Sequence, residues 1–346
     1  MKTVMKIFTV LFLAGTMNIA QAHDEFTKVI KKEFSVNPDA QLTIDNSFGK
    51  VHCNNWDKNI VQMEVTITIE ASGEKEAGKL FDRINVDITG SSTQVDAKTT
   101  IQEGGFNNKG HRIDYMINMP TSINLDLSNK FGDIYISELG GKGRIDLGYG
   151  KMEAGQFLNS DNLIDIKFGN ANIKSIKGAV VNLKYSQMDL GYAGSLRLDS
   201  KYSDLDADKV ISLLMNLEGG KLNVENGSVI EGKSKFSDLS ITRLEQNLTL
   251  DIQYGNCDVD EMPADFTSVS VKNKYGNINI GLPSTANYAL DAELKFCNLD
   301  FPENNASISQ RIITNTSKSY KGNVGKEATP ASKVFIRSEF GNVSLE

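Results

Sequence analysis

The 346-residue sequence is poor in the residues that build metal sites and disulfide frameworks. It has only three histidines and three cysteines. Three histidines leave little material for a His-rich metal site, and three cysteines cannot form a framework of disulfides. The chain also lacks a basic surplus, since 37 Lys and Arg stand against 44 Asp and Glu. Proteins that bind nucleic acid usually show such a surplus, so we expect no nucleic-acid partner.

The first 22 residues have the features of a secretory signal peptide. Lys2 and Lys6 precede an apolar run over 7–14, and Ala20 and Ala22 provide a small-x-small cleavage site. The apolar run is shorter than the ~20 residues that span a bilayer as a helix, and no later segment is apolar enough to do so. We therefore expect an exported protein, in the periplasm or at the cell surface, with no integral membrane segment after leader cleavage.

An internal repeat dominates the rest of the sequence. Each copy reads aromatic, small, polar, apolar, polar, apolar, and from residue 131 to residue 296 the copies recur every 17–21 residues. A degenerate copy without the aromatic begins at Gly219. The aromatic residues of the other copies are Phe48, Phe131, Tyr149, Phe168, Tyr185, Tyr202, Phe236, Tyr254, Tyr275, Phe296 and Phe340.

Each copy carries a period-two pattern on both sides of its aromatic residue. In the copy at Phe131, Leu125 and Leu127 are apolar before it, and Ile134 and Ile136 are apolar after it. Such alternation predicts two strands, each with one buried face. The phase slips at the small residue after the aromatic, which indicates a bulge or corner. A third apolar position follows eight residues after the aromatic, at Leu139, Phe157, Ile176, Val210, Leu244 and Met262.

These features predict an all-β fold, namely a single-stranded parallel β-solenoid (β-helix) with 17–21-residue coils. Coils of this length would stack ~4.8 Å apart, with the aromatics forming a stack inside the solenoid. A β-propeller needs ~40 residues per blade, which the spacing does not provide. An antiparallel sandwich would not explain the identical phase of every copy.

The ends of such a fold need caps, because exposed sheet edges invite aggregation. We expect a signal peptide over 1–22, a β-rich cap over 23–122, solenoid repeats over 123–301, and a C-terminal loop with closing strands over 302–346. The cap contains one short helix over 74–84, with Leu80, Phe81 and Ile84 on its buried side. The polar segment 302–333 is expected to be a long loop or irregular insert.

Outward-facing positions form columns of polar residues. The residue before the aromatic is lysine at 130, 167, 184, 201, 235, 274 and 295. Three residues before the aromatic, four copies have an aspartate, at Asp146, Asp165, Asp199 and Asp251. These predict parallel columns of opposite charge on a solvated face, or a ligand-binding groove. A possible surface ladder runs along the other strand. Its members are Asn256, Asn277 and Asn298 in one column and Asp258, Asn279 and Asp300 beside it.

The ladder favours side-chain hydrogen bonds between stacked coils. Calcium is the alternative, but it would need six to eight oxygens that converge on one point. We therefore predict no bound metal ion and no cofactor.

Catalytic residues are not evident from the sequence. His23, His52 and His111 have no serine or cysteine beside them in a nucleophile motif. Cys53 and Cys257 occupy inward positions and Cys297 the small corner position, which favours three small buried side chains. We expect no enzyme activity and no catalytic residue. The open alternative is a polysaccharide-active β-helix enzyme.

The motifs resemble those of a bacterial "putative adhesin" domain family of unknown function. The resemblance rests on the early DNSFGKV copy, the stretch MPTSINLDLSNKFGDIYI (119–136) and the closing SEFGNVSLE. It implies an exported, non-enzymatic binding or structural module of the cell envelope or surface, an adhesin. It implies as partner a surface polymer or glycan. The remaining alternative is a periplasmic scaffold that associates with an envelope protein.

Overall fold

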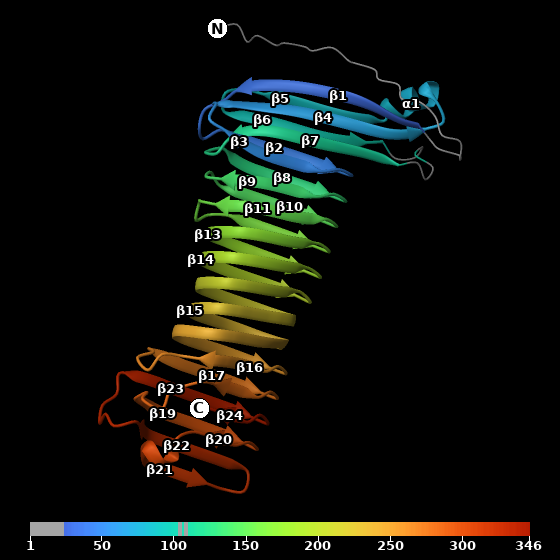
Figure 1. The fold of residues 1–346 in the computed structure, drawn as a ribbon. Helices are drawn as coiled ribbons and strands as arrows, with labels where there is room; N and C mark the ends of the chain where they lie inside the picture. Colours follow the sequence, from blue (N-terminus) through green and yellow to red (C-terminus); the bar gives the residue numbers. More distant parts are fainter. Residues whose placement is uncertain (1–23, 103–105, 107–109) are drawn as a thin grey trace. The chain divides into compact units, whose positions relative to one another are not determined.

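The computed structural model describes residues 24–102, 106 and 110–346. The chain divides into two compact units, Met1–Ile173 and Lys174–Glu346. Figure 1 shows that the described residues are mostly strands, and most strands pair in parallel. The expected leader and His23 lie outside the described residues. The expected domain boundaries stay a prediction.

The first unit begins with a group of antiparallel strands. Strands β1 (Asp24–Ser35), β4 (Ile60–Ala71) and β7 (His111–Pro120) pair antiparallel in that order. Strands β5 (Ile84–Gly90) and β6 (Gln94–Ile101) form a second antiparallel pair. The expected helix is present as α1 (Glu74–Phe81), with Leu80 and Phe81 buried. Ile84 lies beyond the helix and begins β5.

Parallel strands make up the rest of the first unit. One series consists of β6, β2 (Gln41–Ser47), β8 (Asn124–Lys130), β10 (Gly143–Gly148) and β12 (Leu163–Lys167). The other consists of β7, β3 (Val51–Trp56), β9 (Ile134–Leu139) and β11 (Lys151–Phe157). The earliest coil, β2–β3, thus lies between strands that follow it in sequence. The boundary between the units falls within β13 (Asn170–Lys184).

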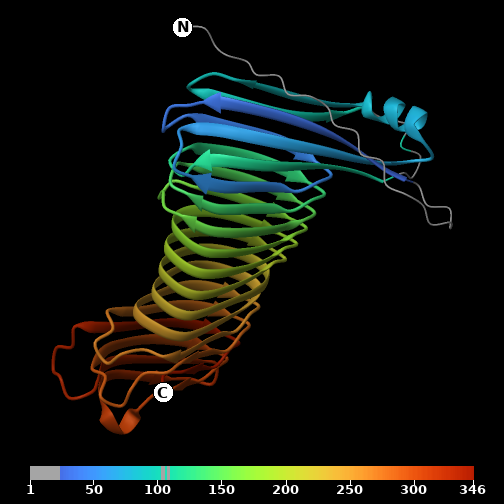
Figure 2. The same cartoon turned by 45° about the horizontal axis from the view of Figure 1, so that its top comes forward.

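The second unit continues with parallel strands, visible from yellow to red in Figure 2. They are β14 (Gln187–Lys201), the long β15 (Asp204–Gln253), β16 (Cys257–Glu261), β17 (Ser268–Lys274), β18 (Ile278–Ile280), β19 (Tyr288–Lys295) and β20 (Leu299–Asp300).

The C-terminal segment differs from its expected form. After a short 3-10 turn (Glu303–Asn305), β21 (Ala306–Ile313) and β22 (Ser317–Val324) form an antiparallel hairpin, and β22 pairs antiparallel with β19. The expectation of a long irregular loop over 302–333 was therefore wrong. The sequence did not reveal this hairpin because most residues of β21 are exposed, so its polar residues show no alternation of buried and exposed positions.

The last strands of the chain insert into the sheet rather than extend it. Strand β23 (Ser332–Glu339) lies between β17 and β19, parallel to both. Strand β24 (Val343–Ser344) likewise lies between β18 and β20. The chain end is thus held within the sheet, and the edge beyond it is covered by the hairpin β21–β22.

The apolar positions of the repeat are buried as the pattern predicted. Leu125, Leu127, Ile134 and Ile136 are all buried, and so are the corresponding apolar residues of the later copies except Ala154, which is half-buried. The third apolar position is buried in each copy named above. These residues fill the interior between the two strand series. They leave no space there for the aromatic rings.

The expected internal aromatic stack was wrong, because the rings point outward. All eleven aromatic residues of the repeat are 38–63% exposed and have φ between 50° and 61°. Because the backbone is left-handed at this one residue, the side chain points to solvent rather than to the inward face that the alternation of the preceding strand predicts. The following small residue does lie at a tight corner: a Cβ on Gly276 would come 1.8 Å from the carbonyl oxygen of Gly255.

Candidate binding surface

The exposed aromatic rings stack on one another in each unit. We call each stack an aromatic column. Neighbouring rings lie 4.9–5.4 Å apart between centroids, with planes within 14° of parallel. The column of the first unit contains Phe48, Phe131, Tyr149 and Phe168, and that of the second contains Tyr185 and Tyr202, then Phe236, Tyr254, Tyr275, Phe340 and Phe296.

The backbone of the columns is unfavourable for aromatic residues. A left-handed conformation costs an L-residue roughly 1–2 kcal/mol, and only Gly, Asn and Asp adopt it readily. Ring stacking returns roughly 0.5–1.5 kcal/mol per pair. Asparagine or glycine would fit these corners without strain, yet eleven of them carry a ring. Conformational strain of this kind clusters at functional sites, so the columns are our first candidate for a binding surface.

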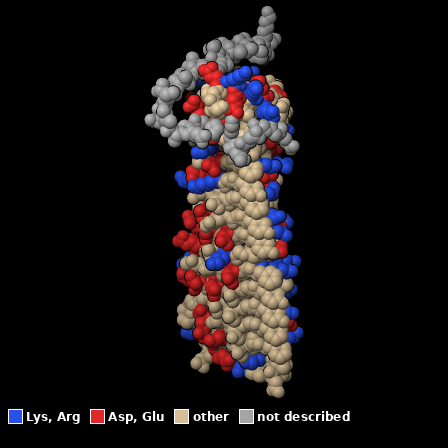
Figure 3. All heavy atoms as spheres, turned by 90° about the vertical axis from the view of Figure 1, so that its right-hand side faces the viewer, with Lys and Arg blue, Asp and Glu red and all other residues tan. Residues whose placement is uncertain are grey.

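The columns place apolar ring faces and edges in solvent. Within each unit, Figure 3 shows uncharged surface with acidic groups on one side of it and basic groups on the other. The basic border comes from the lysines that precede the aromatics, and the acidic border from the strands that follow them. A continuous exposed apolar surface with a polar rim is typical of an interaction site.

Two glutamates, which take the place of the lysine in their own copies, partly neutralise the lysine border. Glu218 binds Lys201 at 2.9 Å, and Glu339 lies 3.5 Å from Lys274 and 2.9 Å from Lys295. Hydrogen bonding to Lys201 lowers the pKa of Glu218, and hydrogen bonding to Lys295 lowers the pKa of Glu339. The expected Asp–Lys pairing also occurs in the first unit, where Lys167 lies 3.6 Å from Asp146.

The predicted Asn residues do lie in one column, and their Oδ1 atoms accept from backbone N–H groups of the next coil, while Nδ2 of Asn256 donates to the Asp238 carboxylate at 3.1 Å. The Oδ1 atom of Asn256 accepts the N–H of Asn277 at 3.0 Å, and Oδ1 of Asn277 accepts the N–H of Asn342 at 3.1 Å. Oδ1 of Asn342 then accepts the N–H of Asn298 at 3.0 Å. Asp238 begins the series by accepting the N–H of Asn256 at 3.0 Å.

Asn342 was missed as a member of this column. Its FGN motif matches the other copies, but the sequence does not reveal that the last coil inserts between earlier ones. The second predicted column is also interrupted. Asp258 accepts a bond from Nδ2 of Asn279 at 2.6 Å, while Ser344 pairs with both Asn279 and Asp300.

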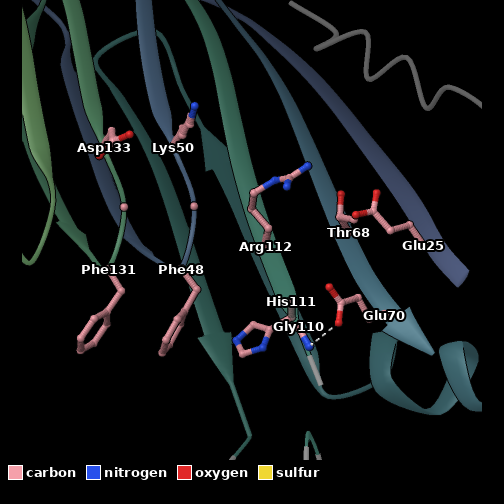
Figure 4. Close-up of a pocket in the computed structure, with 12 residues that line it drawn as sticks. Glu25, Phe48, Lys50, Thr68, Glu70, Gly110, His111, Arg112, Phe131 and Asp133 are labelled. Carbon is pink, nitrogen blue, oxygen red and sulfur yellow. Dashed lines mark hydrogen bonds between the residues drawn. The ribbon is translucent and has the colours of Figure 1, made fainter. Parts of the chain in front are cut away.

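A surface hollow of about 350 Å³ adjoins the first column (Figure 4). Phe48 and Phe131 line one side of it, and His111 packs on Phe48 with ring centroids 4.8 Å apart. The opposite side carries charged groups of both signs. Arg112 is held by Asp114, whose Oδ2 lies 2.6 Å from Nε. The hollow thus combines aromatic faces with mixed charge, as the columns do.

The remaining reactive side chains are placed as structural groups. Burial raises the pKa of the Cys53 and Cys257 thiols to about 12. The third predicted buried cysteine, Cys297, is only half-buried, because it lies at an exposed corner. His52 stacks on Tyr135 at 5.3 Å. Within residues 24–102, 106 and 110–346, no three His, Cys, Asp or Glu residues come together in a way that could hold a metal ion.

Comparison with known proteins gives distant structural likenesses. No family model and no curated protein matches the chain. A solved structure of a "putative cell adhesion protein" from Clostridium sporogenes is 12% identical and covers 92% of this chain and 99% of its own, with a TM-score of 0.17. A "putative adhesin" from Parabacteroides distasonis is 12% identical and covers 92% and 97%, with a TM-score of 0.31.

A further "putative adhesin", from Bacteroides fragilis, is 15% identical and covers 72% of this chain and 96% of its own, with a TM-score of 0.28. These three solved structures are described as adhesins or cell adhesion proteins. In the described part of the chain, no helix has the length and apolar character needed to cross a membrane.

Proposed function

We propose that the chain is an exported, non-enzymatic β-solenoid that binds a surface polymer along its aromatic columns, as an adhesin of a bacterial envelope. The register supports coils of 17–21 residues. Leu196 pairs with Leu213, 17 positions later, and Cys257 pairs with Ile278, 21 positions later.

The observation that carries this proposal is the outward stack of strained rings. Repetition at one layer spacing suits a ligand that is itself repetitive, such as a glycan chain. The C–H faces of sugar rings pack on aromatic rings, while their hydroxyls hydrogen-bond to charged side chains. The columns offer both groups, because rings lie between a lysine border and an acidic border.

Affinity electrophoresis tests the binding surface. The chain would be run through native gels that contain a soluble neutral or acidic polysaccharide. We expect retardation by at least one polymer, and loss of retardation in the double variant Tyr254→Ser/Tyr275→Ser. The matched control is Leu214→Ser, which removes an exposed apolar side chain of β15 outside the columns. Retardation that both variants retain would overturn the role of the columns.

Protease shaving of intact cells tests the location. Digestion of the chain on intact cells, compared with a lysed control, is expected for an adhesin. Protection until lysis would favour a periplasmic scaffold that binds an envelope protein. Release of oligosaccharides from the polymer during either assay would instead favour a polysaccharide-active enzyme.

A further inference from the structure

The aromatic column of the second unit has one missing ring. Lys201 pairs with Glu218, and the N–H of Tyr202 donates to the carbonyl oxygen of Glu218 at 2.9 Å. Gly219 therefore occupies the layer next to Tyr202, where every other copy has an aromatic residue. Its φ of 77° lies in the same left-handed region as the aromatics. The corner geometry is thus retained while the side chain is absent.

Phe236 occupies the layer on the far side of Gly219. It follows 17 residues later, which is the offset that β14 and β15 show. The Lys201 hydrogen bond is the main cause that lowers the pKa of Glu218, which precedes Gly219, and the charge of Lys235, which precedes Phe236, lowers it further. Tyr202 and Phe236 therefore face each other across one empty layer. Two strand spacings of ~4.8 Å put about 9.6 Å between their layers.

The exposure of the rings agrees with this gap. Phe236 is 63% exposed and Tyr202 55%, while the rings that stack on a ring at both sides are 41–52% exposed. Phe296, at the end of the column, is 59% exposed for the same reason. Each of the three most exposed rings has one uncovered face.

Tyr202 leans into the gap. Its Cδ1 atom lies 2.7 Å from the position that a Cβ on Gly219 would take. Its ring is also 5.4 Å from that of Tyr185, compared with 4.9–5.1 Å between the other stacked rings of the repeat. An occupant of the gap therefore requires the Tyr202 ring to move back from Gly219.

Hydrogen-bonding groups border the gap on both sides. On one side, the Glu218 carboxylate binds the Lys201 ammonium group at 2.9 Å, with Lys235 beside it. On the other side, Oδ1 of half-buried Asp204 accepts the backbone N–H of Lys221 at 2.8 Å. The side chain of Lys221 is exposed. The gap thus has apolar faces above and below and charged donors and acceptors at its rim.

We propose that the gap at Gly219 is a subsite for a single pyranose ring, held between Tyr202 and Phe236. A pyranose chair presents C–H groups on its two faces and hydroxyls around its edge, which matches this arrangement. It is thicker than an aromatic ring, so it fits a gap of one whole layer. A free aromatic ring would leave the charged rim unused. Because the gap opens sideways, the ring would be a terminal or branch residue of a glycan. The inference rests on the proposed function and specifies its ligand.

The test uses saturation-transfer NMR with the wild-type chain and a panel of methyl pyranosides. The panel contains glucoside, galactoside, mannoside and N-acetylglucosaminide, with p-cresol as an aromatic probe. We expect saturation of at least one pyranoside, and at least tenfold weaker binding in Gly219→Phe. That variant places a ring in the gap on a left-handed backbone like that of the other corners, and the Tyr202 ring must shift to make room for it. Phe236→Ser should weaken binding without filling the gap, which guards against a folding defect in Gly219→Phe. Leu214→Ser, which removes an exposed apolar side chain outside the columns, is the matched control.

Three outcomes would overturn the inference: no pyranoside is saturated, Gly219→Phe binds as the wild type does, or p-cresol binds in preference to every sugar. These are distinguishable from failure of the proposed function. If Gly219→Phe keeps monosaccharide binding while Tyr254→Ser/Tyr275→Ser loses polymer retardation, the columns bind a polymer and the gap is not a subsite. If the wild type binds a pyranoside through the gap but no polymer is retarded, the subsite stands and the extended surface does not.

Discussion

Tyr275 and Phe340 stack face to face, with ring centroids 4.9 Å apart and planes 4° apart, although 65 positions separate them in the sequence. The contact exists because β23 lies between β17 and β19. The next ring in the column, Phe296, stacks on Phe340 rather than on Tyr275. The C-terminal coil is therefore part of the core of the second unit.

We expect a core substitution in this last coil to be as costly as one in the middle of the repeats. Ile336 is completely buried, so Ile336→Ala should lower the free energy of unfolding by roughly 2–5 kcal/mol. Ile312→Ala on the exposed strand β21 should cost less than about 1 kcal/mol. Urea denaturation measures both. A loss below about 1 kcal/mol for Ile336→Ala would indicate a frayed C-terminus rather than an inserted strand.

Much of this fold could be predicted from the period of the sequence, and the limits have physical reasons. The alternation around Phe131 predicted which faces are buried, because burial follows side-chain phase. The direction of the aromatic ring did not follow from phase, since a single left-handed residue reverses it. The order of coils was also hidden. The motif at Phe340 is like the others, and nothing local to it shows that β23 inserts before β19. The Asn column was predicted, but the insertion of Asn342 was not.

The outward direction of the rings has a consequence for stability. Tyr275→Ala removes two stacking contacts from a half-exposed ring, so we expect a loss of roughly 1–3 kcal/mol. Ile278→Ala, three residues later and fully buried, should cost roughly 2–5 kcal/mol. Thermal and urea unfolding of the two variants compares them directly. A larger loss for Tyr275→Ala than for Ile278→Ala would mean that the ring is part of the core.

The Asn column predicts a difference between two substitutions at one position. In Asn277→Ala the N–H of Asn342 loses its acceptor, which should cost about 1 kcal/mol. Asn277→Asp keeps an oxygen in place and should be close to neutral, because Asp238 already fills this role for the N–H of Asn256. Urea denaturation would show the contrast. Equal losses for the two variants would show that the side-chain oxygen is not what stabilises the column.

The stability of the second unit should depend on Glu339 in acid. Hydrogen bonding to Lys295 lowers the pKa of this carboxyl below its ordinary value. A lowered folded-state pKa stabilises the fold above the unfolded pKa, and this contribution is lost as the pH falls through the folded value. The stability difference between wild type and Glu339→Gln should therefore shrink below about pH 4.5, and also with added salt. The control is Glu231→Gln on β15. A difference that does not change with pH would contradict the ion pairs.

The three cysteines should react with a thiol reagent in two classes. Burial raises the pKa of Cys53 and Cys257 to about 12, so both thiols stay protonated at pH 8. Cys297 is half-buried at an exposed corner, and its Sγ donates to the carbonyl oxygen of Ser338 at 3.4 Å. With a chromogenic disulfide we expect one thiol to react in the native protein and two more after unfolding in urea. Cys297→Ser should remove the native reaction. Fast reaction of three thiols in the native state would mean that the interior opens readily.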